Sequence, residues 1–133
     1  MAEKQFKLEI ISPDRLFYDG AATMVEYKTT EGEVGVYADH VAMTQIIAPG
    51  KLTITEADGT KKEAALISGF VEILADKITI LAETVEWPDD IDKERAEAAK
   101  KRAEERLAKK DSGSIDVARA ELALQRALIR LSF

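Results

Sequence analysis

The chain contains no cysteine, which excludes disulfide bonds and metal sites built on thiolates. His40 is its only histidine, so a catalytic triad or a histidine-based metal site would lack the partners it needs. No segment approaches the roughly 18 uncharged apolar residues of a membrane-spanning helix, and the first residues lack the apolar run of a signal peptide. These absences predict a soluble, cytoplasmic protein without a catalytic site of its own.

Acidic residues outnumber basic ones, and the excess is confined to one part of the chain. The net charge of −6 falls entirely within residues 1–84, whereas acidic and basic residues balance in residues 85–133. An acidic first part argues against general nucleic-acid binding, which depends on a basic surface. Every arginine except Arg15 lies in the balanced second part. Because strand-like sequence also gives way to helix-like sequence here, we expect two domains, 1–84 and 85–133.

The first domain has the pattern of short β-strands. Residues 6–10 alternate apolar and polar side chains with period two, as a half-buried strand does. Asp58-Gly59 and Ala75-Asp76 each separate two apolar runs, which indicates tight hairpins. A turn is also expected at Asp19-Gly20. Short strands at this spacing predict a sandwich or a flattened barrel, with strands at 6–10, 16–18, 24–27, 52–55, 64–67, 70–74 and 77–81.

The segment 30–40 is the least strand-like part of this domain and is expected to form an exposed loop. Gly32 and Gly35 indicate bends within it. They do not make a phosphate-binding loop, because no lysine followed by serine or threonine comes after them and the acidic neighbours would repel phosphate. A simple turn explains the glycines, and a contact with another protein stays open.

Helix-forming residues dominate after Trp87-Pro88, and the first helix is expected from Ile91 to about Lys110. Proline is tolerated at a helix start, and Asp89 and Asp90 are candidate N-caps. Helical spacing predicts that this helix buries a narrow stripe of small side chains, namely Ala96, Ala99, Ala103 and Leu107.

The second helix is expected from Ile115 to about Leu131, with Ser114 as its N-cap. The short turn at 111–114 leaves an antiparallel pair as the simplest arrangement. Because alanines bury little area, this hairpin should be marginal by itself. A ligand or partner would then stabilise it, or it would detach. The predicted apolar face of the second helix includes Ile115, Ala118, Leu122 and Ile129.

Antiparallel pairing would place the end of the second helix beside the start of the first. Arg126 and Arg130 would then lie near Asp92 and Arg95. Guanidinium groups and a helix N-terminus both attract anions, and a carboxylate can accept from an exocyclic amine. This combination suits a nucleotide. The alternative is a solvated face with salt bridges between neighbouring turns, such as those that Glu121 could form.

Four stretches of the sequence match one known family: Ile11–Asp14, Glu31–Val36 with Asp39-His40, Ser68–Ile73, and Arg119–Leu124 with Arg126-Ala127. Together they resemble the ε subunit of F-type ATP synthases over essentially the whole chain. The resemblance implies an α+β fold, in which an antiparallel β-sandwich precedes an antiparallel two-helix hairpin.

The resemblance further implies a non-catalytic rotor subunit of the central stalk, peripheral at the cytoplasmic face of the cell membrane. Such a subunit binds the γ subunit and rests its β domain on the c-ring, and the loop with Glu31, Gly32 and His40 would supply the c-ring contact. Its helices either fold as a hairpin or extend into the catalytic α/β head and block ATP hydrolysis.

ATP-binding bacterial members of this family carry the motif Ile/Leu-Asp-x-x-Arg-Ala, which reads Ile91–Ala96 here. The resemblance implies that Ile91 and Asp92 address adenine while the arginines hold the phosphates. It leaves open whether a magnesium ion accompanies ATP, and no protein side chain is expected to ligate a metal. The implied ATP-binding residues are Glu86, Ile91, Asp92, Arg95, Ala96, Arg102, Arg126 and Arg130.

Overall fold

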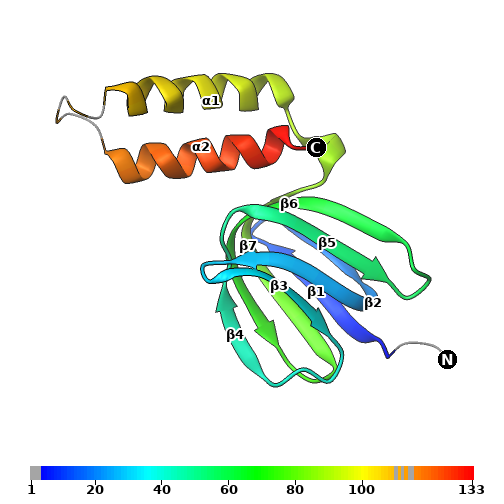
Figure 1. Cartoon of the computed structure of the whole chain (residues 1–133). Coiled ribbons are helices and arrows are strands. Elements are labelled where there is room, and N and C mark those ends of the chain that lie inside the picture. Colours follow the sequence, from blue (N-terminus) through cyan, green and yellow to red (C-terminus); the bar gives the residue numbers. More distant parts are fainter. Residues whose placement is uncertain (1–3, 110, 112, 114–115) are drawn as a thin grey trace. The chain divides into compact units, whose positions relative to one another are not determined.

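A computed structural model describes residues 4–109, 111, 113 and 116–133 of the chain (Figure 1). The chain forms two compact units, Met1–Trp87 and Pro88–Phe133. The first is a β-sandwich and the second contains helices, which confirms the predicted fold class. The boundary lies at 87/88 instead of the expected 84/85, because the last strand of the sandwich continues through Glu86.

In the described residues the first unit has seven strands, joined in the order β1-β7-β6-β5-β2-β3, with β4 paired to β6. β1 also pairs with β2, so the pairings β1-β7-β6-β5-β2-β1 form a closed ring, to which β3 is added beside β2. The pairings are antiparallel as predicted, except that β1 and β7 run parallel. The strands are β1 (Phe6–Ser12), β2 (Arg15–Thr29), β3 (Gly32–Tyr37), β4 (Met43–Ile46), β5 (Gly50–Glu56), β6 (Lys61–Ile73) and β7 (Lys77–Glu86).

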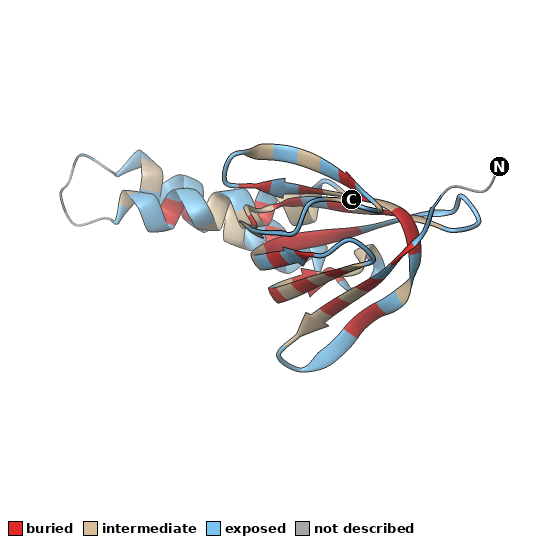
Figure 2. Ribbon diagram, turned by 90° about the horizontal axis from the view of Figure 1, so that it is seen from below, coloured by how far each residue is buried: buried red, intermediate tan, exposed pale blue. Residues whose placement is uncertain are grey.

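The core of the sandwich consists of inward-facing residues from its strands (Figure 2). Leu8 and Ile10 on β1 and Leu52 and Ile54 on β5 are fully buried, and each alternates with more exposed neighbours. Full burial of such a side chain contributes about 1.5–3 kcal/mol. The period-two pattern of the sequence therefore corresponds directly to the two faces of each strand.

Tyr27 adds a pH-sensitive group to this core. It is 2% exposed, and its hydroxyl donates to Oε1 of Gln45. Burial raises the pKa of Tyr27 to about 12. An unfolded tyrosine ionises near pH 10, so between pH 10 and about 12 the unfolded chain binds fewer protons than the folded one. Tyr27 should therefore lower the free energy of unfolding by about 2–3 kcal/mol as the pH rises through this range.

This loss can be measured as the free energy of urea unfolding at several pH values up to about 12. Tyr27→Phe should remove the contribution of Tyr27 and flatten the curve above pH 10. If the free energy of unfolding of Tyr27→Phe fell as steeply above pH 10 as that of the native chain, this assignment would be contradicted. Tyr37, an exposed tyrosine on β3, provides the matched control as Tyr37→Phe.

The hairpins predicted at 57–60 and 75–76 are confirmed by the antiparallel pairs β5–β6 and β6–β7. The turn expected at Asp19-Gly20 was wrong, since β2 continues through both residues and pairs them with β1. The runs 64–67 and 70–74 fall mainly within one strand, β6, whose pairing with β7 shifts register near Gly69.

The expected loop at 30–40 was also wrong in part, because β3 occupies much of it. This strand pairs with β2, setting Val36 opposite Val25 and Gly35 opposite Glu26. Val36 is buried and Glu33 and Tyr37 are exposed, so the segment has one inward and one outward face. Pairing along β2 satisfies the backbone groups on that side of β3 despite the two glycines.

The second unit begins with a short 3₁₀ helix, η1 (Pro88–Asp90), followed by α1 (Lys93–Ala108) and α2 (Val117–Leu131). The N-cap of α1 is Asp92, so the expectation of Asp89 or Asp90 was wrong; both belong to η1. The expected cap Ser114 and helix start Ile115 lie outside the described residues, as does Lys110. Asp116 caps α2 by accepting from the backbone N–H of Arg119 at 3.1 Å.

Alanines form the buried face of each helix. Ala96 and Ala103 are buried on α1, as predicted, and Ala120 and Ala127 are buried on α2. The predicted face of α2 was wrong in part, because Ala118 and Leu122 are exposed whereas Ile129 is half-buried. Each alanine pair is seven residues apart, which keeps both members on one side of a helix. Burying methyl groups instead of leucine side chains gives the hairpin a small hydrophobic stabilisation.

Candidate functional site

The end of the hairpin where α1 starts and α2 finishes, residues 91–95 and 126–133, is called the hairpin mouth here. Lys93 Nζ donates to the carbonyl oxygen of Phe133, so the two ends are adjacent. Figure 1 shows the helices side by side and antiparallel. This confirms the predicted pairing, which brings Arg126 and Arg130 to the same end of the hairpin as Asp92 and Arg95.

Asp92 shapes the start of α1. Its backbone is extended, and its Oδ1 accepts from the backbone N–H of Arg95 at 3.0 Å. Its carbonyl oxygen accepts the N–H of Ala96, the first bond of the helical ladder. The partial positive charge of a helix N-terminus is therefore combined here with a carboxylate that keeps a second oxygen for other partners.

The arginines of the mouth differ in exposure. Arg95 is exposed, whereas Arg126 and Arg130 are half-buried. Nε of Arg126 is buried and has no hydrogen-bond partner among the described residues. A buried donor without a partner costs about 1–3 kcal/mol, so an acceptor brought by a ligand would be favourable at this position.

The remaining predicted ATP-binding residues lie in several places. Arg102 is exposed on α1, seven residues beyond Arg95 and hence about 10 Å further along the helix axis. Ile91 is buried and its N–H donates to the carbonyl of Pro88. Ala96 belongs to the buried alanine face. Glu86 belongs to the first unit, where it pairs with Ala65 at the end of β7.

The residues predicted to contact the c-ring do not gather at one point. Glu31 and Gly32 lie where the chain enters β3, and His40 follows the other end of this strand. An extended strand rises about 3.3 Å per residue, so the six residues of β3 alone span roughly 20 Å. One partner could contact all three residues only along the length of β3.

Hydrogen bonds hold both ends of β3. Thr29 Oγ1 donates to the carbonyl of Gly32 at 2.9 Å and accepts from the N–H of Glu31 at 3.1 Å. Beyond the other end, the N–H of Asp39 donates to the carbonyl of Ala75 at 2.8 Å, and Lys4 donates to the Asp39 carboxylate at 2.7 Å. The two candidate contact turns are therefore anchored to the sandwich.

Exposed apolar side chains gather on β4, at the end of β6 and on the segment before β4. Val41 is 78% exposed and Ile46 is 64% exposed, and Ile46 pairs directly with Phe70. Met43 pairs with Ile73 and therefore lies on the opposite face of β4 from Ile46. The face that carries Ile46 is called the β4–β6 apolar surface; its members are Ile46, Phe70 and Leu74. It was not predicted from the sequence, although alternation along 70–74 puts Phe70 and Leu74 on the face opposite buried Val71 and Ile73.

A groove adjoins this surface at Phe70. It has a volume of about 330 Å³, and its wall is mostly apolar. Its lining residues come from β1, β6, β7 and the turn after β1: Ile11, Ser12, Pro13, Gly69, Phe70, Leu81, Ala82 and Glu83. Adjacent apolar side chains and an apolar groove are features of protein-binding surfaces.

Across the described residues, no group of three histidine, cysteine, aspartate or glutamate side chains is placed to hold a metal ion. Neither helix, over the part of the chain that the structure describes, is both long and apolar enough to cross a membrane.

Family models match both parts of the chain. Residues 5–88 match the β-sandwich domain of the ATP synthase delta/epsilon chain, and residues 89–133 match its long α-helix domain. These two ranges follow the two structural units closely. The order of the domains also agrees with the resemblance found in the sequence.

Curated relatives extend over nearly the whole chain. The ATP synthase epsilon chain of Clostridium novyi is 42% identical over 128 residues, which is 96% of each chain. The epsilon chain of Ruminiclostridium cellulolyticum is 46% identical over 127 residues, covering 96% of this chain and 93% of the relative.

A chain in the cryo-EM structure of Euglena gracilis mitochondrial ATP synthase has a similar fold, with a TM-score of 0.79. It is 24% identical in sequence, and the match covers 91% of this chain and 76% of that one. The chain therefore belongs to the ATP synthase delta/epsilon chain family, and it is a non-catalytic subunit of that complex.

Proposed function

We propose that the chain is a rotor subunit of a proton-translocating F-type ATP synthase, which binds ATP in its folded hairpin and inhibits ATP hydrolysis when the hairpin extends. The observation that supports ATP binding is the composition of the hairpin mouth. A helix N-terminus, the Asp92 carboxylate and the guanidinium groups of Arg95 and Arg126 lie at one end of a weakly packed hairpin.

ATP would fit the mouth through complementary polar groups. The adenine amine can donate to the Asp92 carboxylate, and apolar contact with the base is assigned to Ile91. The arginines would carry the phosphate charge, with Nε of Arg126 gaining the acceptor that it lacks. Ala96, Arg102 and Arg130 complete the proposed site within the helical unit, and magnesium is an additional candidate ligand of the phosphates.

Binding at the mouth would couple nucleotide concentration to the shape of the hairpin. ATP contacts residues from both helices only while they are paired, so it stabilises the folded form and opposes the extended one. At an ATP concentration 100 times its dissociation constant, the gain is about 2.7 kcal/mol. Such a gain is sufficient to shift the equilibrium between the folded and the extended hairpin, because the buried residues of its interface are alanines.

Isothermal titration calorimetry of the isolated chain with ATP tests this proposal. The native chain should release or absorb heat with a one-to-one stoichiometry, and Asp92→Ala/Arg95→Ala should abolish the signal. Since Asp92 also caps α1, circular dichroism must show that the variant keeps its helices. Absence of heat from the native chain at millimolar ATP would exclude the nucleotide-binding part.

The sandwich would supply the contacts within the rotor. We assign the β4–β6 apolar surface to the γ subunit, because a stable subunit contact buries adjacent apolar side chains. The c-ring would contact the turn with Glu31 and Gly32, together with His40 if its surface follows β3. These contacts would hold the chain peripherally at the cytoplasmic face of the cell membrane.

A second candidate keeps the rotor role but gives the hairpin a purely structural or protein-binding task. Exposed leucines on α2 favour it, since Leu122 is 38% and Leu128 is 45% exposed. In this version the helices contact the catalytic α/β head and bind no nucleotide.

Removing residues 88–133 from the assembled complex separates a regulatory hairpin from a passive one. If the hairpin inhibits, ATP hydrolysis by the truncated complex should rise, and the rise should be largest at low ATP. Equal hydrolysis rates with and without the hairpin at low and high ATP would contradict regulation by either route.

A further inference from the structure

The last residue of the β unit is held by aromatic side chains from β2. The ring of Trp87 stacks on Phe17 with centroids 4.3 Å apart and planes at 20°, and it meets the edge of Tyr18 at 6.5 Å. Both partners are buried, and Trp87 packs against the core of the sandwich. All three rings belong to the unit that ends at Trp87.

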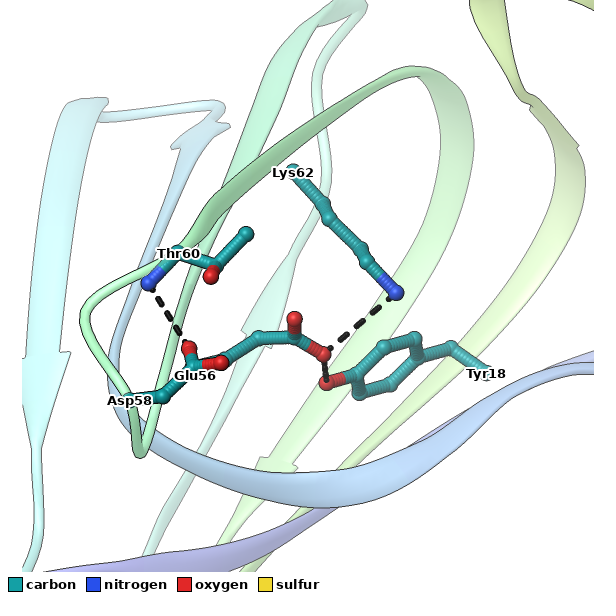
Figure 3. A network of polar contacts seen from close by, with 5 residues as sticks. All are labelled: Tyr18, Glu56, Asp58, Thr60 and Lys62. Carbon is teal, nitrogen blue, oxygen red and sulfur yellow. Dashed lines mark hydrogen bonds and ion pairs between the residues drawn. The ribbon is translucent and has the colours of Figure 1, made fainter.

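A polar network fixes the Tyr18 ring in turn (Figure 3). The Tyr18 hydroxyl donates to Oε2 of Glu56 at 2.7 Å, and Lys62 approaches the same oxygen at 3.5 Å. Burial and the hydrogen bond to Glu56 raise the pKa of Tyr18, so the hydroxyl keeps its proton and remains a donor. Glu56 and Lys62 flank the β5–β6 turn, where Thr60 N–H donates to Asp58.

The end of β7 needs such support because its pairing is interrupted. Glu86 and Val85 pair with Ala65 and Leu66 on β6, but the register shifts before the next pair, at Ser68. These last two pairs are therefore separated from the regular ladder that forms most of the β6–β7 contact. Interrupted pairs at a strand end open more easily than a continuous ladder.

The chain changes character directly after Trp87. Pro88 has no N–H to continue the ladder, and it restricts the preceding residue to extended backbone. The next residues form η1, which contains no buried residue, and the helical ladder begins only after Asp92. Residues 88–92 thus connect a regular strand to a regular helix with little secondary structure of their own.

We infer that the contacts of Trp87 with Phe17 and Tyr18 form an anchor: when the hairpin opens, any movement of the chain that reaches the sandwich is confined to residues 88–92, and the end of β7 stays protected. This inference rests on the proposed function in one respect, because it assumes that the hairpin opens. When it does, α1 and α2 move about a pivot that stays fixed to the sandwich, and the pairing of Val85 and Glu86 is retained.

Hydrogen–deuterium exchange of the full chain tests the anchor without ATP. Ala103→Asp/Ala120→Asp puts like charges into the alanine interface and should open the hairpin, which exchange in α1 and α2 reports. Amides of Val85 and Glu86 should keep their native rates in this variant. Adding Trp87→Ala should accelerate them at least tenfold, while Trp87→Phe, which keeps a stacked ring, should not.

Two controls make the result specific. Phe70→Ala removes an exposed aromatic ring of β6 outside the stack and should leave Val85 and Glu86 protected. Trp87 is the only tryptophan, so acrylamide quenching of its fluorescence should be the same in the native chain and in the opened variant. Unchanged exchange after Trp87→Ala, or quenching that doubles on opening, would overturn the anchor. Neither outcome depends on ATP binding, which calorimetry tests separately.

Discussion

Gly69→Ala is expected to lower the free energy of unfolding of the β unit by about 3 kcal/mol or more. Gly69 has φ of +138°, a conformation that residues with a Cβ rarely adopt. An added Cβ would lie 2.1 Å from the carbonyl oxygen of Leu81 and 2.8 Å from Cα of Ala82. Both atoms belong to the β7 backbone, so the strand itself would have to move.

Gly59→Ala is the matched control for this substitution. Gly59, on the β5–β6 turn, also has positive φ, at +89°, but a Cβ added to it would have no neighbouring atom within 4 Å. The cost of this substitution should be about 1 kcal/mol, from backbone conformation alone. Urea unfolding followed by circular dichroism compares the two variants. Equal midpoints would show that the approach of β7 to Gly69 does not limit stability.

Arg126→Ala is expected to weaken ATP binding by about 10- to 100-fold, because hydrogen bonds to charged groups contribute about 1.5–3 kcal/mol. Arg126 is the mouth arginine whose Nε is buried without a described hydrogen-bond partner. A phosphate or ribose oxygen would supply that acceptor. The substitution should leave the unliganded hairpin at least as stable, since it removes a buried donor that costs free energy.

Arg106→Ala is the control for the loss of a positive charge. Arg106 lies in the last turn of α1, at the opposite end of the hairpin from the mouth. Calorimetric titrations at one ionic strength should show near-native affinity for this variant. Equal weakening by both substitutions would indicate that ATP senses only the overall charge of the hairpin, and the assigned site would then be wrong.

Local signals in the sequence predicted much of the fold. Asp58-Gly59 identified the β5–β6 hairpin, and period-two alternation identified β1. The segment 30–40 was misjudged because its glycines have weak strand propensity, and only pairing with β2 makes it a strand. Such pairing depends on residues that local sequence does not bring together.

The hairpin illustrates the same limit. Helical spacing correctly predicted Ala96 and Ala103 as buried, but the predicted face of α2 included Leu122, which is exposed, and did not name Ala120, which is buried. Close packing against an alanine face selected the smaller side chain. The short connection between the helices was enough to predict that the end of α2 lies beside the start of α1. The burial of Arg126 Nε could not be predicted in this way, because it depends on how the side chains pack.

Because β1 pairs with β7, the β-sandwich is expected to fold more slowly than the helical hairpin. This pairing joins residues near the start of the chain, such as Leu8, to Ile78, so the sandwich needs contacts between segments that are distant in sequence. Folds dominated by such contacts form in about milliseconds to seconds. Contacts between α1 and α2 span a much shorter loop, and local helical structure relaxes within about microseconds. The hairpin can therefore form many times within the time that the sandwich needs to fold once.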